Sequence, residues 1–224
     1  MFEYVKFVNE MPETKKIPAF PLPIVVFPEE ELRLHIFEPR YKQLIKDCAE
    51  KGIVFGIIPV LNSKMMEIGT IVRLEEIVKE YDDGRMDIKL SSHGLFNVLE
   101  FQNKWPGKLY SAIDMQMLEF DNSREKDLDE KVMKLFNELC ELNHVKPFHP
   151  ISWDQFISFK LGHYVGFSME EEYKFCILTT EKERLNKLIQ QLEFMIEQSK
   201  QRQEWLKRMN MNGEFRNFDL KNLK

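Results

Sequence analysis

Apolar and polar positions alternate through the first half of the chain, as they do in half-buried β-strands. Leu32, Leu34 and Ile36 alternate with Arg33 and His35. Residues 53–60 are almost continuously apolar, which is typical of a central strand buried on both faces. Further strands are predicted at 71–80, 85–90, 95–101 and 109–118. The first 120 residues are therefore expected to be β-rich.

Glycines and prolines limit these strands. Asp83 and Gly84 supply the positive φ angles of a tight turn and predict a hairpin. Gly56 lies inside an apolar run and indicates that another backbone comes close there. Proline cannot donate to a β-ladder, so the first extended pieces are expected to be short or at an edge. The prolines concerned are Pro18, Pro21, Pro23 and Pro28.

One helix is predicted among the strands, at 39–51. Pro39 suits the first helical position, and Gly52 stands where a left-handed C-cap residue belongs. The apolar positions recur with helical spacing, at Tyr41, Leu44, Ile45 and Cys48. This short amphipathic helix is expected to pack on the sheet.

The apolar period becomes helical near Asp121. One helical face is formed by Leu128, Val132, Leu135, Phe136, Leu139 and Leu142. Three later pairs have the spacing of a capping box, in which a hydroxyl residue and an acidic or amide residue cap a helix start reciprocally. They are Ser152 with Gln155, Ser168 with Glu171, and Thr180 with Glu183. The second half is thus expected to be a helical bundle.

The last predicted helix, at 181–209, is longer than a compact bundle would cover. Its length is about 40 Å at 1.5 Å per residue. Trp205, Leu206 and Met209 follow a polar stretch and are expected to project. The chain is accordingly predicted to be an α+β protein with a β domain at 1–120, a helical bundle at 121–209 and a flexible tail at 210–224.

Composition limits the classes of partner and the cellular compartment that are expected for this chain. The net charge of −5 and the pI of about 5.7 provide no basic field for a phosphate backbone, so nucleic acid is an unfavoured partner. Three scattered cysteines, Cys48, Cys140 and Cys176, predict free thiols in a reducing compartment. Neither a signal peptide nor a membrane-spanning run is recognised. A cytoplasmic protein without a membrane partner is expected.

Recognisable catalytic and cofactor motifs are lacking. The chain has no phosphate-binding P-loop, dinucleotide-binding glycine motif, nucleophile elbow or His-Glu-x-x-His helix. Ser91, Ser92 and His93 are neighbours, but adjacent strand residues point to opposite faces. Cys140, His144 and His149 have metal-like spacing but lack a fourth ligand. We expect no catalytic residue, metal or cofactor.

The opening of the chain resembles the N-terminal substrate-recognition domain of the ATP-dependent Lon protease. The residues that carry this resemblance are Ile17 with Pro18, Ala19, Phe20, Pro21 and Leu22, then Val25 with Val26, Phe27 and Pro28, and then Leu34 with His35, Ile36, Phe37, Glu38, Pro39, Arg40 and Tyr41. Later matches are Ile68 with Gly69, Thr70, Ile71 and Val72, the turn at Asp83 and Gly84, Gly94 with Phe96 and Val98, and Cys176 with Ile177, Leu178, Thr179, Thr180, Glu183, Arg184, Leu185 and Leu188. The family usually has an arginine shortly after the glycine corresponding to Gly94, whereas Leu95, Phe96 and Asn97 follow here.

The resemblance implies a β pseudo-barrel of the PUA-like class, followed by a helical bundle that ends in a long helix. It also implies that the chain recognises unfolded or tagged polypeptides and works with a separate ATPase or protease. The ATPase and protease modules of Lon follow this domain and have no counterpart here, so the chain looks like a stand-alone, non-enzymatic Lon-domain protein.

Four residues are candidates for contact with a bound polypeptide. Glu38, Arg40 and Gln43 lie near the start of the short helix and off its apolar face, where they could meet a carboxylate. The alternative is a solvated helix end with Glu38 as a cap. Trp105 lies in a predicted loop. Its side chain either contacts the bound polypeptide or packs over the barrel.

Three other hypotheses stand beside peptide recognition, which predicts an apolar groove between the β half and the helices. The first is an RNA-associated PUA-like protein, by analogy of fold. The second is a hydrolase whose site is assembled from scattered residues. The third is self-association through the end of the last helix, at Trp205 and Leu206.

Overall fold

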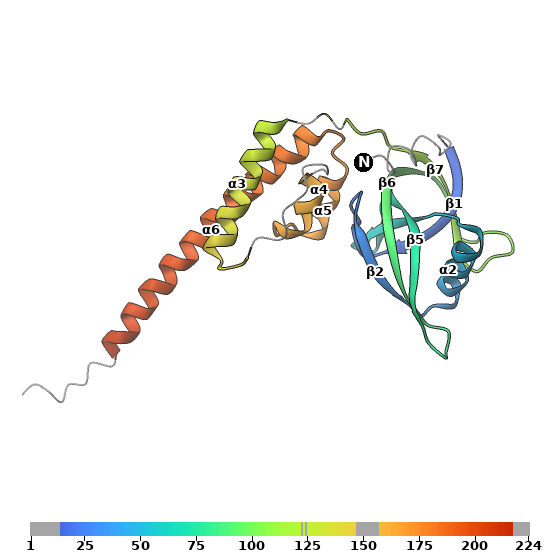
Figure 1. Ribbon diagram of the computed structural model, residues 1–224, viewed down its shortest axis with the longest axis horizontal. Helices are drawn as coiled ribbons and strands as arrows, with labels where there is room; N and C mark the ends of the chain where they lie inside the picture. Colours follow the sequence, from blue (N-terminus) through green and yellow to red (C-terminus); the bar gives the residue numbers. More distant parts are fainter. Residues whose placement is uncertain (1–13, 122, 124, 147–156, 217–224) are drawn as a thin grey trace, which may run out of the picture.

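The computed structural model describes residues 14–121, 123, 125–146 and 157–216. A β-barrel and a group of helices lie side by side, and the longest helix points away from both (Figure 1). The structure thus has the predicted α+β architecture. The proposed boundary near residue 120 remains a prediction, because Phe27, Leu61 and Leu95 share one apolar cluster with the helices.

Five strands close the barrel. Strand β1 pairs with β7 and also, in parallel, with β3, while β6 and β5 complete the circuit from β7 back to β3. Closure removes the free edges that an open sheet of these strands would have. Strand β2 pairs with the first half of β6, and β4 pairs with β3. The strands are β1 Thr14–Leu22, β2 Glu31–Ile36, β3 Phe55–Leu61, β4 Lys64–Met65, β5 Ile68–Glu80, β6 Met86–Gln102 and β7 Ser111–Met117.

Helix α2, Pro39–Lys51, has the bounds that its sequence predicts. Gly52 ends it in the left-handed conformation, with φ 63°. Its apolar side packs against the barrel in a buried cluster that includes Tyr41, Leu44 and Ile45. Strand β3 is buried on both faces, as its continuous apolar run predicts.

Two strand predictions were wrong in detail. Residues 86–90 and 95–101 belong to one strand, β6, because the polar residues between them remain paired with β5. Ser92 finds partners there, since its Oγ donates to Phe27 O at 2.5 Å. The close neighbour of Gly56 is a side chain rather than a backbone, because a Cβ atom would lie 2.5 Å from Phe96 Cζ.

The helices after the barrel begin and end as follows: α3 Lys126–Leu142, α4 Ile157–Leu161, the 3-10 helix η1 Gly162–Tyr164, α5 Met169–Cys176 and α6 Glu181–Arg216. The capping boxes predicted at Ser168 and Thr180 are both present, with reciprocal hydrogen bonds to the acidic residue three positions later. The box predicted at Ser152 and Gln155 lies outside the described residues.

Helix α6 extends past Met209, where it was expected to end. The added residues include Asn210, Asn212 and Gly213, whose low helix propensity favoured an earlier end, yet the helix continues through them to Arg216. The 36 residues of α6 correspond to about 54 Å. Its outer part projects beyond the other helices (Figure 1).

Phe27 joins the barrel to the helices. Its ring is 1% exposed and stacks on His163 of η1 at a centroid distance of 4.1 Å. It also meets Phe175 of α5 edge-on at 5.6 Å. Gly162 permits this approach, because a Cβ atom there would lie 2.3 Å from Phe27 Cε2. The barrel and the helices therefore share a packed apolar contact.

His163 adds an ionic bridge at the same junction. Its Nε2 lies 3.2 Å from Glu30 of the β1–β2 connection, and its Nδ1 lies 2.7 Å from Glu172 of α5. Burial alone would lower the pKa of His163, but the hydrogen bonds and charges of the two carboxylates outweigh it and raise the pKa to about 9.

The His163 bridge predicts a pH-dependent stability. A pKa raised above the ordinary value of 6.5 means that folding favours the protonated ring. The stabilisation is fully present below about pH 6.5 and is lost as the pH rises through 9. Urea unfolding of the wild type and of His163→Gln is expected to differ more at pH 6 than at pH 9.5. An equal difference at both pH values would contradict this role.

Candidate functional site

The predicted contact residues at the start of α2 are already paired with each other. Arg40 Nε donates to Glu38 Oε2 at 2.9 Å, and the guanidinium lies 4.4 Å from the ring centre of Tyr41. Glu38 occupies the N-cap position, but its side chain makes no capping hydrogen bond. The cap of the alternative interpretation is therefore present in position, with Glu38 O accepting from Tyr41 N and Lys42 N, but it has no side-chain hydrogen bond. Arg40 remains about half exposed and retains donors for a ligand.

Gln43 and Trp105 are brought together by the loop between β6 and β7. Gln43 Oε1 accepts a hydrogen bond from Leu109 N at 2.7 Å. Trp105 is half-buried and meets the ring of Tyr110 edge-on at 6.1 Å. Trp105 thus packs over the barrel, one of the two arrangements that the sequence allowed. The side chain beside Gln43 that faces solvent is Leu109, at 55% exposure.

Asp47, which sequence reasoning did not select, fixes this loop to α2. Its Oδ2 accepts from Lys108 Nζ and from Tyr110 Oη, each at 2.6 Å, and its Oδ1 accepts from Lys51 at 3.2 Å. Burial would raise the pKa of Asp47, but the hydrogen bonds from Lys108, Tyr110 and Lys51 outweigh it and lower the pKa to about 2. The pKa of Tyr110 is raised by burial and by this carboxylate.

Replacing Asp47 is expected to loosen the loop. Asp47→Asn keeps the shape but loses the charge-assisted bonds, so the free energy of unfolding is expected to fall by roughly 1.5–3 kcal/mol. Amide exchange at Leu109 is expected to accelerate more than exchange in β3. Exchange that is unchanged at Leu109 would show that the carboxylate does not hold the loop.

These contacts define an ordered surface on the barrel, here named the α2–loop surface. It comprises Phe37, Arg40, Gln43, Trp105 and Leu109. Phe37 lies two residues before Pro39, the first residue of α2, and is 61% exposed. Leu109 and Arg40 thus present an apolar side chain and a cation on the loop and α2, which Gln43 and Asp47 hold together, while Phe37 presents a second apolar side chain at the start of α2.

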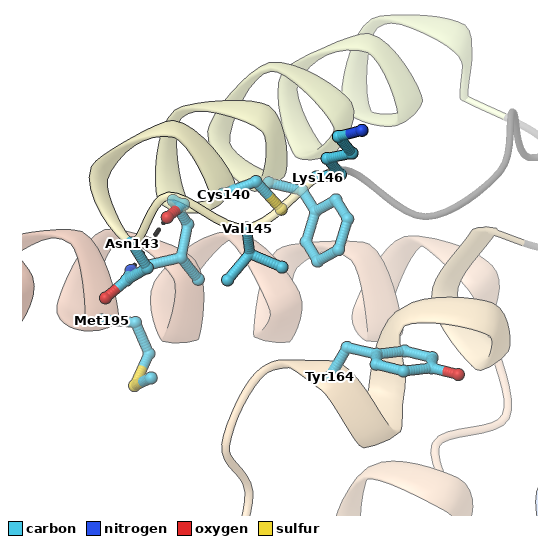
Figure 2. Close-up of a pocket in the computed structure, with 8 residues that line it drawn as sticks. Cys140, Asn143, Val145, Lys146, Tyr164 and Met195 are labelled. Carbon is cyan, nitrogen blue, oxygen red and sulfur yellow. Dashed lines mark hydrogen bonds between the residues drawn. The ribbon is translucent and has the colours of Figure 1, made fainter.

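A second feature is an apolar hollow in the helical part (Figure 2). It has a volume of about 250 Å³ and opens to solvent between the end of α3, η1 and α6. Val145 and Tyr164 are exposed at it, whereas Cys140 is buried. Its lining consists of Phe136, Leu139, Cys140, Asn143, Val145, Lys146, Tyr164 and Met195.

The hollow lies elsewhere than the groove expected between the β half and the helices. At that junction Phe27 packs directly on Phe159 and Phe175, so side chains fill the space. Sequence periodicity had identified Phe136 and Leu139 only as a helical core face. Val145 lies in a connection whose course periodicity does not predict, so the pattern contained no signal for this hollow.

Ser91 and His93 are close in space but not in the order of a catalytic triad. Ser91 Oγ lies between the carboxylate of Glu75 and His93 Nε2, which is 2.8 Å away. In a serine triad the imidazole takes the middle position. In the described part of the chain, no three His, Cys, Asp or Glu side chains are grouped to hold a metal ion. His149 of the sequence-suggested cluster lies outside the described residues.

Comparison with solved structures defines the class of fold. The structure is similar to a Lon N-terminal domain protein from Xanthomonas campestris, with a TM-score of 0.62, 22% sequence identity, and coverage of 78% of this chain and 97% of that chain. It is also similar to the N-terminal domain of Lon protease from the Mycobacterium avium complex, with a TM-score of 0.61, 11% identity, and coverage of 80% and 98% respectively. The barrel and helices together therefore form a Lon N-terminal domain fold.

The family follows from the sequence itself. Residues 16–221 match the family model of the ATP-dependent protease La (LON) substrate-binding domain. The chain belongs to this family, as the resemblance at its opening predicted. Among the described helices, none combines the length and apolar character needed to cross a membrane.

Proposed function

We propose that this chain is a non-catalytic recognition module that binds unfolded or extended polypeptide at the α2–loop surface. Membership of a substrate-binding domain family supports the recognition of polypeptide. The observation that carries the choice of surface is the fixation of the loop, in which Gln43 and Asp47 bind the segment that bears Leu109.

Fixation matters because binding loses affinity when flexible groups must be ordered. Leu109 and Phe37 offer apolar contact, and Arg40 offers charge-assisted hydrogen bonds to a carboxylate of the bound chain. Such contacts suit partners of varied sequence, since apolar burial is non-directional. Glu38 and Trp105 contribute by orienting Arg40 and by supporting the loop.

A binding experiment tests the surface with a matched control. A fluorescein-labelled, permanently unfolded polypeptide is titrated with the whole chain, and anisotropy is followed. Leu109→Asp is expected to weaken binding about tenfold or more, which corresponds to about 1.4 kcal/mol. Leu99→Asp is expected to change affinity less than twofold, because Leu99 is equally exposed, at 56%, but belongs to strand β6 and not to the α2–loop surface.

Two results would contradict the proposal. One is the absence of binding by the wild-type chain at concentrations where its fold is intact. The other is an equal loss of affinity in Leu109→Asp and Leu99→Asp. Thermal unfolding of both variants checks that neither loss reflects unfolding.

The proposal includes partners and location. We propose that bound polypeptide is passed to a separate ATPase or protease, and that the chain acts in the cytoplasm. The predicted self-association through α6 would use a surface on the helices and leave the α2–loop surface free.

A further inference from the structure

Helix α6 leaves an apolar end beyond the helices that support it (Figure 1). Within the described residues, Gln203 is the outermost side chain of α6 bonded to α3, donating to Leu142 O at 2.5 Å. Beyond it Trp205, Leu206 and Met209 are 59%, 45% and 51% exposed. A helical segment without tertiary contacts is marginal in water, so apolar residues on it indicate a partner.

A groove adjoins this end on the same face of α6. Its volume is about 440 Å³, and Trp205 forms its outer rim. Met195 and Asn143 line both this groove and the apolar hollow of Figure 2, so the two adjoin each other. One helix face therefore carries a hollow near Met195 and an exposed aromatic ridge ten residues later, about 15 Å away.

We infer that the occupant of this groove is α6 of a second copy of the chain. The two helices run antiparallel, and Trp205 of each copy enters the hollow of the other. A hollow of about 250 Å³ accepts an aromatic side chain, because an apolar cavity of roughly 150 Å³ already holds benzene. A ridge and a hollow on one helix make the contact self-complementary, as a two-fold dimer requires.

The sequence of α6 fits this pairing. With the two-fold axis near Lys200, Met195 faces the second copy's Trp205, and Phe194 faces its Leu206. Phe194 is 56% exposed and gains an apolar neighbour. Around the axis the groove is lined by the polar side chains Gln198, Ser199 and Gln201 and by the charged side chain of Arg202.

Charge favours the antiparallel direction. The outer segment carries Lys200, Arg202, Lys207 and Arg208 against one acidic residue, Glu204. The region around the hollow contains Glu138, Glu141, Glu193 and Glu197 together with Lys146. Glu138 and Glu193 form ion pairs within the same copy, with Lys200 and Lys131, so Glu141 and Glu197 are the carboxylates offered to the basic end of a second copy. Antiparallel pairing places the basic end of one copy near these carboxylates of the other, whereas parallel pairing places like charges together.

Sedimentation of the whole chain tests the association. The wild type is expected to form a concentration-dependent dimer. Trp205→Asp is expected to raise the dissociation constant about 30-fold or more, the effect of a central interface residue. Leu99→Asp, with similar exposure on the barrel, is expected to leave it unchanged. Trp205 projects from the bundle, so its replacement leaves the fold intact, which circular dichroism checks.

Disulfide trapping tests the direction. In the antiparallel pair, two copies of residue 201 lie near the axis, whereas two copies of residue 208 are about 24 Å apart along it. A disulfide needs Cα atoms within about 7 Å. Gln201→Cys is therefore expected to link readily and Arg208→Cys not to link. The native cysteines are buried and do not interfere.

The two experiments give different results depending on whether the antiparallel dimer forms. Loss of the dimer in Trp205→Asp together with linkage only in Gln201→Cys supports the inference. A wild-type chain that stays monomeric at all concentrations overturns it, as does a dimer that survives Trp205→Asp or links equally in Arg208→Cys. Polypeptide binding at the α2–loop surface is measured separately, so either proposal can fail alone.

Discussion

Arg184→Met is expected to lower the free energy of unfolding by about 3–5 kcal/mol, because it leaves Glu181 as an unpaired buried charge. Both side chains are buried, with exposed fractions of 0% for Arg184 and 1% for Glu181. Arg184 donates to Glu181 Oε2 through Nε at 3.0 Å and Nη2 at 2.8 Å, and to Leu178 O at 2.7 Å. Its guanidinium also lies 4.4 Å from the ring centre of Phe159. Urea unfolding measures the loss.

Two further variants separate this mechanism from a general effect of losing arginine. Arg208→Met removes an arginine whose side chain is 80% exposed and is expected to change stability by less than about 0.5 kcal/mol. The double variant Glu181→Leu with Arg184→Met removes both charges and is expected to be more stable than Arg184→Met alone. A double variant that is less stable would refute the unpaired charge as the cause.

Phe27→Ala is expected to cost about 3–5 kcal/mol, the usual range for removing a buried phenylalanine ring. The ring fills the junction between Phe159, His163 and Phe175, so its loss leaves a cavity where the barrel meets the helices. Unfolding monitored by near-UV and far-UV circular dichroism is expected to shift to lower urea concentration.

Phe37→Ala is the matched control, because it makes the same chemical change at a ring that is 61% exposed. Its expected effect on stability is within about 0.5 kcal/mol. Equal losses in the two variants would mean that the packing of Phe27 does not couple the barrel to the helices.

The sequence predicted those features of the fold that depend on residues close together in the chain. Pro39 and Gly52 placed the ends of α2 correctly, and the hydroxyl and acidic pairs at Ser168 and Thr180 placed two helix starts. The end of α6 was missed because Asn210, Asn212 and Gly213 have low helix propensity and favoured an end near Met209, whereas the helix continues to Arg216. The continuity of β6 was missed because pairing with β5, rather than local polarity, keeps residues 91–94 in the sheet.

The candidate site was less predictable, because it also depends on contacts between residues that are far apart in the chain. Gln43 and Trp105 were selected separately, and only the fold shows that one loop connects them. Asp47 was overlooked because its partners Lys108 and Tyr110 lie about sixty residues away in the chain. A single sequence contains no sign of such a pairing. The burial of Arg184 is equally invisible, since a charged residue in a helix ordinarily faces solvent.

The way in which the barrel closes affects how the protein is made. Of the described strands, β1 is the first to leave the ribosome, yet its antiparallel partner is β7, where Ala19 pairs with Ser111. At translation rates of about 5–20 residues per second, β1 waits roughly 5–20 s for that partner. During this interval Phe20 and Ile17, both buried in the finished barrel, are exposed on an incomplete sheet. The nascent chain is therefore expected to depend on chaperones until β7 has left the ribosome.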